Sequence, residues 1–85
     1  MTGRVSHKIA STGTVIGRSA ILRSFNVTIA VAAGRIVLRD GGAGGEVKLD
    51  AATDVAVNMN TLNIHFETDI HATVTGVTEA VITRD

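Results

Sequence analysis

Alternation of apolar and polar residues is the dominant pattern along the chain. The longest example runs from Ile21 to Val31. Its apolar residues share one parity, and the polar or small residues take the other: Ile21, Phe25, Val27, Ile29 and Val31 against Ser24, Asn26, Thr28 and Ala30. A period of two predicts a strand with one buried face. Arg23 interrupts the apolar parity, so we expect it at an exposed end of this strand.

Further segments of the same kind follow at short spacing. They are Arg35–Asp40, Glu46–Ala51, Asp54–Met59, Leu62–Phe66, Ile70–Thr75 and Glu79–Arg84. Two weaker segments, Arg4–Ala10 and Thr14–Ile16, are compatible with strands or with an arm that lies on a neighbouring molecule. Proline is absent, and no segment keeps a helical period. The pattern predicts one all-β domain over residues 1–85, a small antiparallel β-sandwich or jelly-roll-like fold of seven or eight strands, with residues 1–18 either inside it or forming an N-terminal arm.

The glycine-rich stretch RIVLRDGGAGGEVKLD is the one segment that resembles a catalytic loop. A phosphate-binding loop requires a following Lys-Ser/Thr and the start of a helix, whereas Glu46 and a predicted strand follow here. A hairpin with the four-residue loop 41–44 fits better, because it places Asp40 opposite Gly45 and gives a consistent register. That register has apolar pairs inside and mainly charged pairs outside: Leu38–Val47 and Ile36–Leu49, then Arg39–Glu46, Val37–Lys48 and Arg35–Asp50. We therefore predict a hairpin tip.

The composition indicates a thin hydrophobic core. Phe25 and Phe66 are the only aromatic residues, both on predicted inward positions, and there is no cysteine to form a disulfide or a thiolate metal site. A small domain without such crosslinks gains stability from self-association. We expect a homo-oligomer, with a trimer as its order.

The charge balance excludes some classes of partner. Eight Lys and Arg residues match eight Asp and Glu residues, so the chain lacks the basic surface of a nucleic-acid-binding protein. No apolar run approaches the roughly 20 residues of a membrane span, and the start of the chain lacks a signal-peptide core. We expect neither nucleic acid nor membrane as a partner.

Two histidines are weak candidates for a metal site. If the segments 62–66 and 70–75 form a hairpin with the loop 67–69, His65 and His71 lie opposite each other on the outer face, near Glu67 and Asp69. Zinc is bound by such side chains. The alternative is a solvent-facing pair of polar residues, which we favour because a zinc site also requires a third ligand at fixed geometry.

The remaining chemistry does not favour an enzyme or a cofactor. No Ser or Thr lies in a strand-to-helix elbow of the kind that presents a nucleophile. The carboxylates fall at strand ends and outer faces, without the dense spacing of a calcium loop. Carbohydrate-binding sandwiches stack sugars on exposed aromatic rings, and this chain has no Trp or Tyr. We expect a protein that is not an enzyme and binds no cofactor.

Two stretches resemble small all-β structural proteins of tailed phages, especially marine and cyanobacterial phages: GRIVLRDGGAGGEVKLDA and NIHFETDIHATVTGVTEAVITRD. The matching positions are Leu38, Asp40 and Gly41 in the first stretch, and Ile64, Phe66, Thr68 and Ile70 in the second. The resemblance covers roughly residues 20 to 85. The chain departs from the pattern at its end, Thr83-Arg84-Asp85, which is charged and not aromatic.

This resemblance implies a non-enzymatic virion component, made in the host cytoplasm, that binds the major capsid protein or other virion proteins as a capsid decoration or cement protein. A receptor- or glycan-binding tip module of a tail fibre or spike is the alternative. For assembly we single out the N-terminal segment from Arg4 to Ile16, because its apolar residues have no predicted partner strand. These residues are Val5, Ile9, Val15 and Ile16.

Overall fold

A computed structural model describes residues 4–85 of the chain, and these residues form nine strands and no helix. The strands are β1 (Val5–Ile9), β2 (Gly13–Ile16), β3 (Ala20–Ile29), β4 (Arg35–Asp40), β5 (Glu46–Ala52), β6 (Asn58–Met59), β7 (Ile64–Phe66), β8 (Ile70–Thr75) and β9 (Glu79–Arg84). The predicted all-β fold is confirmed. The strand number exceeds the predicted seven or eight because both N-terminal segments are strands.

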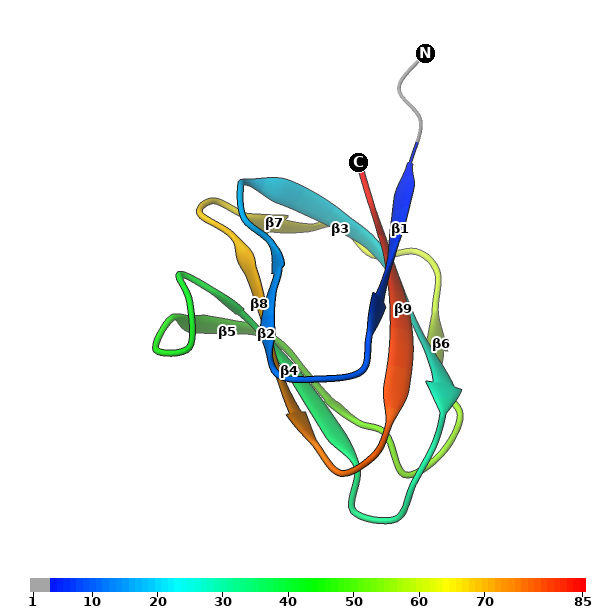
Figure 1. Cartoon of the computed structure of the whole chain (residues 1–85). Helices are drawn as coiled ribbons and strands as arrows, with labels where there is room; N and C mark the ends of the chain where they lie inside the picture. Colours follow the sequence, from blue (N-terminus) through cyan, green and yellow to red (C-terminus); the bar gives the residue numbers. More distant parts are fainter. Residues whose placement is uncertain (1–3) are drawn as a thin grey trace.

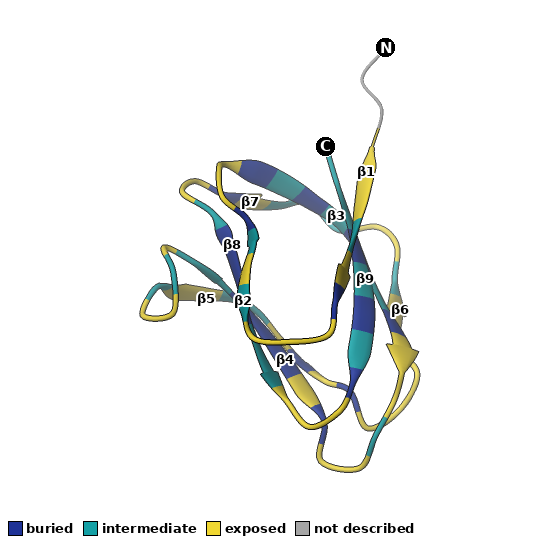
Figure 2. Cartoon of the chain, viewed as in Figure 1, coloured by how far each residue is buried: buried dark blue, intermediate teal, exposed yellow. Residues whose placement is uncertain are grey.

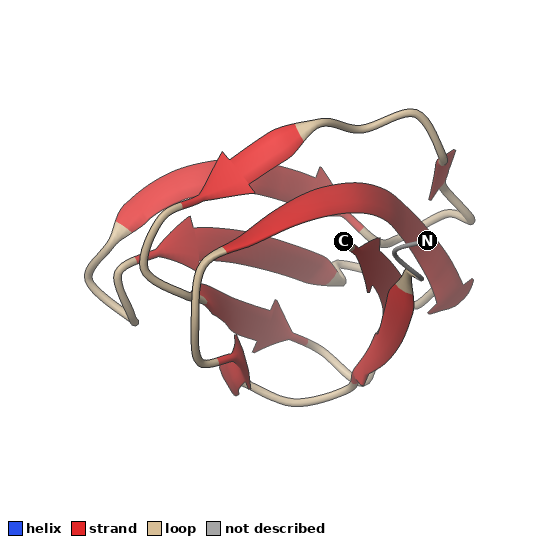
Figure 3. Cartoon of the chain, turned by 90° about the horizontal axis from the view of Figure 1, so that it is seen from above, coloured by secondary structure: helices blue, strands red, loops and turns tan. Residues whose placement is uncertain are grey.

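The strands form two antiparallel sheets that pack face to face as a small β-sandwich (Figures 1 and 3). Sheet A has the order β1-β9-β3-β6, with β7 also paired to β3, and sheet B has the order β2-β8-β4-β5. Among the described strands, β4 and β5 are the only two that are consecutive in sequence and paired with each other. Of the remaining connections between described strands, all except β6–β7 cross from one sheet to the other.

The core lies between the sheets and consists mainly of aliphatic side chains. Figure 2 shows buried positions recurring along the strands of both sheets. Phe25 and Phe66 are its largest members and are 0% and 1% exposed, as predicted for inward positions. Ile9 of β1 and Ile16 of β2 also belong to the core. The N-terminal segment is thus an integral part of both sheets, which decides between the two interpretations left open by the sequence.

A bulge in β3 corrects the parity predicted for this strand. The pairing of β3 with β9 shifts between Leu22 and Ser24, so Arg23 is an extra residue on β3. Leu22, and not Ile21, occupies the fully buried position, while Phe25 and Val27 remain inward as predicted. Ile29 is 47% exposed. Arg23 lies in the middle of the strand because the bulge turns its side chain away from the core.

The β4–β5 hairpin forms as predicted, but its register differs. The loop comprises residues 41–45, Asp40 pairs with Glu46, and a bulge at Lys48 moves Leu38 opposite Leu49. Leu38 is buried and Val47, opposite Arg39, is 46% exposed, so the predicted Leu38–Val47 pair is wrong. The other four predicted pairs are displaced as direct pairs by the same change of register. Arg35 still forms an ion pair with Asp50, now across a diagonal of the outer face. The charge pattern alone did not reveal the bulge.

Residues 4–85 include no helix long and apolar enough to span a membrane.

Candidate functional site

The two histidines singled out from the sequence lie in different sheets. His65 is on β7, which pairs with β3 in sheet A, and His71 is on β8, which pairs with β2 and β4 in sheet B. The predicted cross-strand pair of histidines is therefore wrong. Short loops suggest hairpins, but the loop 67–69 is a crossover between sheets. Within the described residues, no group of three or more His, Asp or Glu residues has the arrangement of a metal site.

His71 is buried on the outer face of sheet B. It pairs with Thr14 on one side and with Arg39 on the other, and only 9% of the residue is exposed. The His71 Nδ1 and Arg39 Nε atoms are both buried without a hydrogen-bond partner in the described part of the chain. Because buried polar atoms without partners are unfavourable, we expect this cross-strand pair to add little to the stability of the fold.

A set of side-chain to main-chain hydrogen bonds joins the β4–β5 loop to the β7–β8 crossover. The Asp40 carboxylate accepts hydrogen bonds from the main-chain N–H groups of Glu67 (2.8 Å) and Thr68 (2.8 Å). In return, Asp69 Oδ1 accepts the N–H groups of Gly41 (2.9 Å) and Gly42 (3.1 Å). Each carboxylate therefore binds the turn that carries the other. We call this reciprocal arrangement of Asp40 and Asp69 the carboxylate latch.

The carboxylate latch accounts for the glycines at positions 41 and 42 of the β4–β5 loop. Gly41 and Gly42 have φ values of 107° and 81°, which side chains rarely adopt, and this backbone directs both N–H groups at one oxygen. Successive N–H groups of this kind form an anion-binding concavity. The loop does bind an anion as a phosphate loop would, but the anion is the carboxylate of Asp69 in the same chain.

The same contacts shift the ionisation of Asp40. The N–H groups of Glu67 and Thr68 stabilise the charged carboxylate and lower the pKa of Asp40 below its ordinary value, and the positive charge of Lys48 adds to the effect. Asp40 therefore carries its negative charge at neutral pH.

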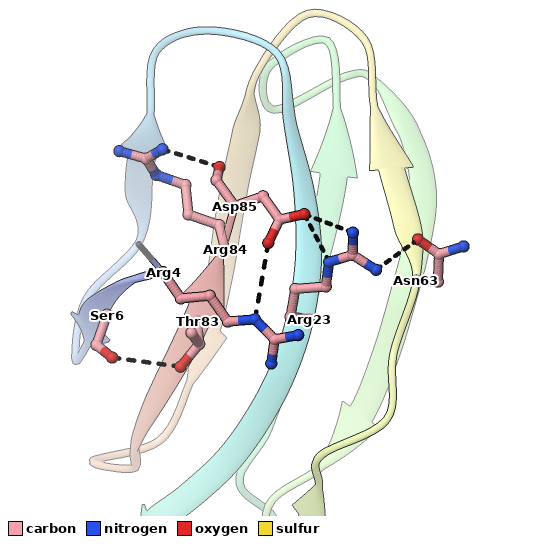
Figure 4. Close-up of polar contacts among 7 residues, drawn as sticks. All are labelled: Arg4, Ser6, Arg23, Asn63, Thr83, Arg84 and Asp85. Atoms are coloured by element: carbon pink, nitrogen blue, oxygen red, sulfur yellow. Dashed lines mark hydrogen bonds and ion pairs between the residues drawn. The ribbon is translucent and has the colours of Figure 1, made fainter. Parts of the chain in front are cut away.

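A second polar cluster surrounds Asp85 at the end of β9 (Figure 4). The Asp85 carboxylate accepts a hydrogen bond from Arg23 Nε at 2.8 Å and lies 3.7 Å from Arg4 Nε. Arg23 also donates to the side-chain oxygen of Asn63 at 3.0 Å. The bulge that turns Arg23 outward thus provides a partner for Asp85.

This cluster changes the pKa values of both partners. The hydrogen bond from Arg23 lowers the pKa of Asp85, and the same bond raises the pKa of Arg23. On the inner side of β9, Arg84 Nε donates to His7 Nε2 at 3.2 Å. These contacts connect β1, β3 and β9 at one end of sheet A.

A groove of about 460 Å³ opens beside the Asp85 cluster. It is lined by Ser19, Ala20, Ile21, His65, Phe66, Glu67 and Asp85. Its polar groups are a hydroxyl, an imidazole and two carboxylates, which match the hydrogen-bonding pattern of a polyhydroxylated or cationic ligand.

The assembly residues singled out from the sequence have different environments. Ile9 and Ile16 are 2% and 5% exposed in the core, Val15 packs against that core, and Val5 is 43% exposed. Val5 lies on β1, an edge strand of sheet A, so the edge itself is available for contact. Of the four residues, Val5 has the side chain most accessible to a partner.

The sheet edges differ in regularity. The register of β2 with β8 shifts after Thr14, and that of β5 with β4 shifts at Lys48. By contrast, β1 pairs with β9 over five consecutive positions without a bulge. Bulges twist an edge away from further pairing, so β1 is the edge best suited to accept another strand.

Reasoning from the sequence missed the latch and the Asp85 cluster. Both involve residues far apart in sequence: Asp40 and Asp69 are 29 positions apart, and Arg23 and Asp85 are 62 positions apart. The sequence signals available were Asp40 next to glycines and Asp69 at a turn. Their pairing could not be predicted because it depends on the loop 67–69 crossing between the sheets.

Comparison with protein-family models, with curated proteins and with solved structures found no match to this chain.

Proposed function

We propose that the chain is a non-enzymatic structural component of a tailed-phage virion, a capsid decoration or cement-type protein that binds other virion proteins. The resemblance of residues 20 to 85 to small all-β phage proteins motivates the virion context. The observation that carries the binding mode is the regular, solvent-facing edge of β1, which lies within the N-terminal segment singled out for assembly.

Binding at this edge proceeds by strand addition. Every edge strand leaves alternate main-chain N–H and C=O groups without an intramolecular partner, and a strand from another protein satisfies them while side-chain contacts select it. On β1 the exposed Val5 offers an apolar contact and Lys8 offers a charge.

Self-association through the same edge is part of this proposal. Pairing of β1 with β1 of a second copy is two-fold symmetric and gives a dimer. A trimer requires β1 to pair with a different edge of the next copy around a closed ring. Light scattering of the purified protein distinguishes these states from a monomer.

Single substitutions test the edge better than deletion of residues 2–16, which would remove Ile9 and Ile16 from the core. Along β1, the main-chain N–H of one residue points toward β9 and that of the next residue points toward solvent. Of Ser6→Pro and His7→Pro, one variant therefore loses an N–H that faces β9 and the other loses an N–H that faces solvent. The variant that loses the outward N–H is expected to stay folded and to lose binding to purified capsids. Val5→Glu is expected to weaken binding, and Val77→Glu, at an 87% exposed position in the β8–β9 turn, is the matched control.

The number of copies of this chain in purified virions tests the proposal that it is a virion component. Decoration requires a copy number comparable to that of the major capsid protein. Absence of the chain from virions, or capsid binding that both proline variants retain while folded, would contradict the proposal.

A receptor- or glycan-binding tip module is the second candidate, and the groove beside Asp85 favours it. Ser19, His65 and Glu67 offer hydroxyl-binding groups there. Binding to a glycan array that Glu67→Ala removes would support this function over decoration.

A further inference from the structure

The sequence contains a single Asp-Gly or Asn-Gly bond, Asp40–Gly41, and it lies within the carboxylate latch. We propose that Asp40–Gly41 is a latent site of isoaspartate formation and that Asp69 suppresses the reaction by holding the Gly41 main-chain nitrogen. This inference does not depend on the proposed virion function.

The reaction is a cyclisation followed by hydrolysis. The Gly41 main-chain nitrogen attacks the side-chain carboxyl carbon of Asp40, a new C–N bond forms, and the carboxyl oxygen leaves as water after taking up the proton of the N–H group. Water then opens the five-membered imide at either carbonyl. Opening at the main-chain carbonyl leaves the chain running through the Asp40 side chain, which is isoaspartate. No oxidant or reductant is involved.

Glycine at the second position makes this bond reactive, because it has no side chain to hinder the approach of its nitrogen. In an unrestrained peptide, the Asp40 side chain would rotate freely until its carboxyl carbon met that nitrogen. The latch restrains both reacting groups. The Gly41 N–H is bound to Asp69 Oδ1 at 2.9 Å, and the Asp40 oxygens are bound to Glu67 N and Thr68 N at 2.8 Å each.

The charge state of Asp40 acts in the same direction. Cyclisation needs a protonated Asp40 carboxyl group, because its oxygen leaves as water. The contacts from the crossover lower the pKa of Asp40 and so reduce the protonated fraction. Gly45 N also donates to Gly42 O at 3.0 Å, which fixes the loop that follows. Reaction therefore requires local opening of the latch.

The two parts of the latch also predict what the modification would do. Isoaspartate at residue 40 adds one carbon to the main chain at the end of β4 and replaces the side chain that binds Glu67 and Thr68. The crossover 67–69 would then lose its bonds to the hairpin. Damage at Asp40–Gly41 and release of the β7–β8 crossover are consequently one event.

The test compares the folded protein with a synthetic peptide of residues 36–46 at neutral pH and elevated temperature. Isoaspartate is measured by peptide mapping with mass spectrometry and by methylation with an isoaspartyl methyltransferase. The folded protein is expected to react about tenfold or more slowly than the peptide, since only locally opened molecules react. Equal rates would overturn the proposal, and this comparison needs no variant.

Two substitutions of Asp69 then identify the responsible contact. Asp69→Ala removes the acceptor of the Gly41 N–H and is expected to raise the rate several-fold. Asp69→Asn keeps an oxygen at the same position and is expected to stay near the wild-type rate. Asp54→Ala, at an exposed carboxylate outside the latch, is the control. A folded Asp69→Ala variant, as judged by circular dichroism, with an unchanged or lower rate would show that Asp69 does not protect the bond.

Discussion

Sheets A and B bury their residues differently. In β9, a central strand of sheet A, burial alternates, with Ala80 and Ile82 fully buried and Val81 and Thr83 only partly so. In sheet B, Val37 and His71 are buried although their side chains lie on the outer face. Alternation therefore describes β9, whereas β4 and β8 bury three successive residues each.

The difference follows from the neighbours on each outer face. Beside Val81 lies the short side chain of Asn26, which is itself only partly buried and leaves Val81 partly open to water. Val37 lies between Arg35 and Arg39 on the same strand and face, and long arginine side chains cover apolar neighbours with their methylene groups. Burial on an outer face thus depends on the length of adjacent side chains as well as on parity.

The largest expected effect is on the shared core. Phe25→Ala, at a fully buried position of β3, is expected to reduce the free energy of unfolding by about 3–5 kcal/mol. Urea denaturation followed by circular dichroism measures this change. Val77→Ala, at an 87% exposed turn position, is expected to have almost no effect. Comparable losses from both variants would show that Phe25 is not in the core.

A direct test of the comparison between the sheets uses two valines on outer faces. Val37→Ala in sheet B removes two buried methyl groups and is expected to cost about 1.5 kcal/mol at about 0.8 kcal/mol for each. Val81→Ala in sheet A is expected to cost less than half as much, because Val81 is already partly exposed. If urea denaturation gave equal losses in the free energy of unfolding for both variants, the outer faces of the two sheets would not differ in burial.

The His71–Arg39 pair should contribute little net stability despite its burial. His71→Leu removes a buried nitrogen that lacks a partner and is expected to leave the free energy of unfolding within about 1 kcal/mol of wild type, or to raise it. His65→Leu on the exposed β7 position is the control. A clear loss for His71→Leu alone would indicate that His71 makes a favourable polar contact.

The smallest effect is the dependence of stability on acid pH. Asp40 and Asp85 both have pKa values below their ordinary value in the folded chain, because Glu67 N–H and Arg23 respectively stabilise their charged forms. Their contribution is complete above the unfolded pKa of about 3.9 and is lost as the pH falls through the lower folded values. The thermal midpoint should therefore fall in that acidic range.

Asp40→Asn and Asp85→Asn should each flatten this acid dependence, while Asp54→Asn should leave it unchanged. Thermal unfolding at a series of pH values between about 7 and about 2 provides the measurement. Unchanged acid profiles for the first two variants would argue against stabilising contacts to those carboxylates.

Much of the fold follows from local sequence. Period-two alternation located most strands, and the inward positions of Phe25 and Phe66 were predicted correctly. The bulges at Arg23 and Lys48 were not predicted, because a bulge changes parity without changing composition. An arginine on the apolar parity of β3 was the one visible signal, and it was assigned to a strand end.

The polar sites were less predictable than the strands. The short loop between Phe66 and Ile70 suggested a hairpin with facing histidines, but the chain crosses between sheets there. Whether a short loop turns back within a sheet or crosses to the other one depends on the partners available to β7 and β8, which are β3 and β4. The latch between Asp40 and Asp69 follows from that crossover.

The position of β9 has a consequence for how the chain folds. β9 is the last strand in the sequence, yet it lies between β1 and β3 in sheet A. The first strand has no partner in its own sheet until β9 is in place, so sheet A is completed only after residues 79–84 have been synthesised. Pairing of such distant segments slows folding. Until β9 is in place, β1 has unpaired main-chain groups on both sides, a state in which a strand can pair with another molecule.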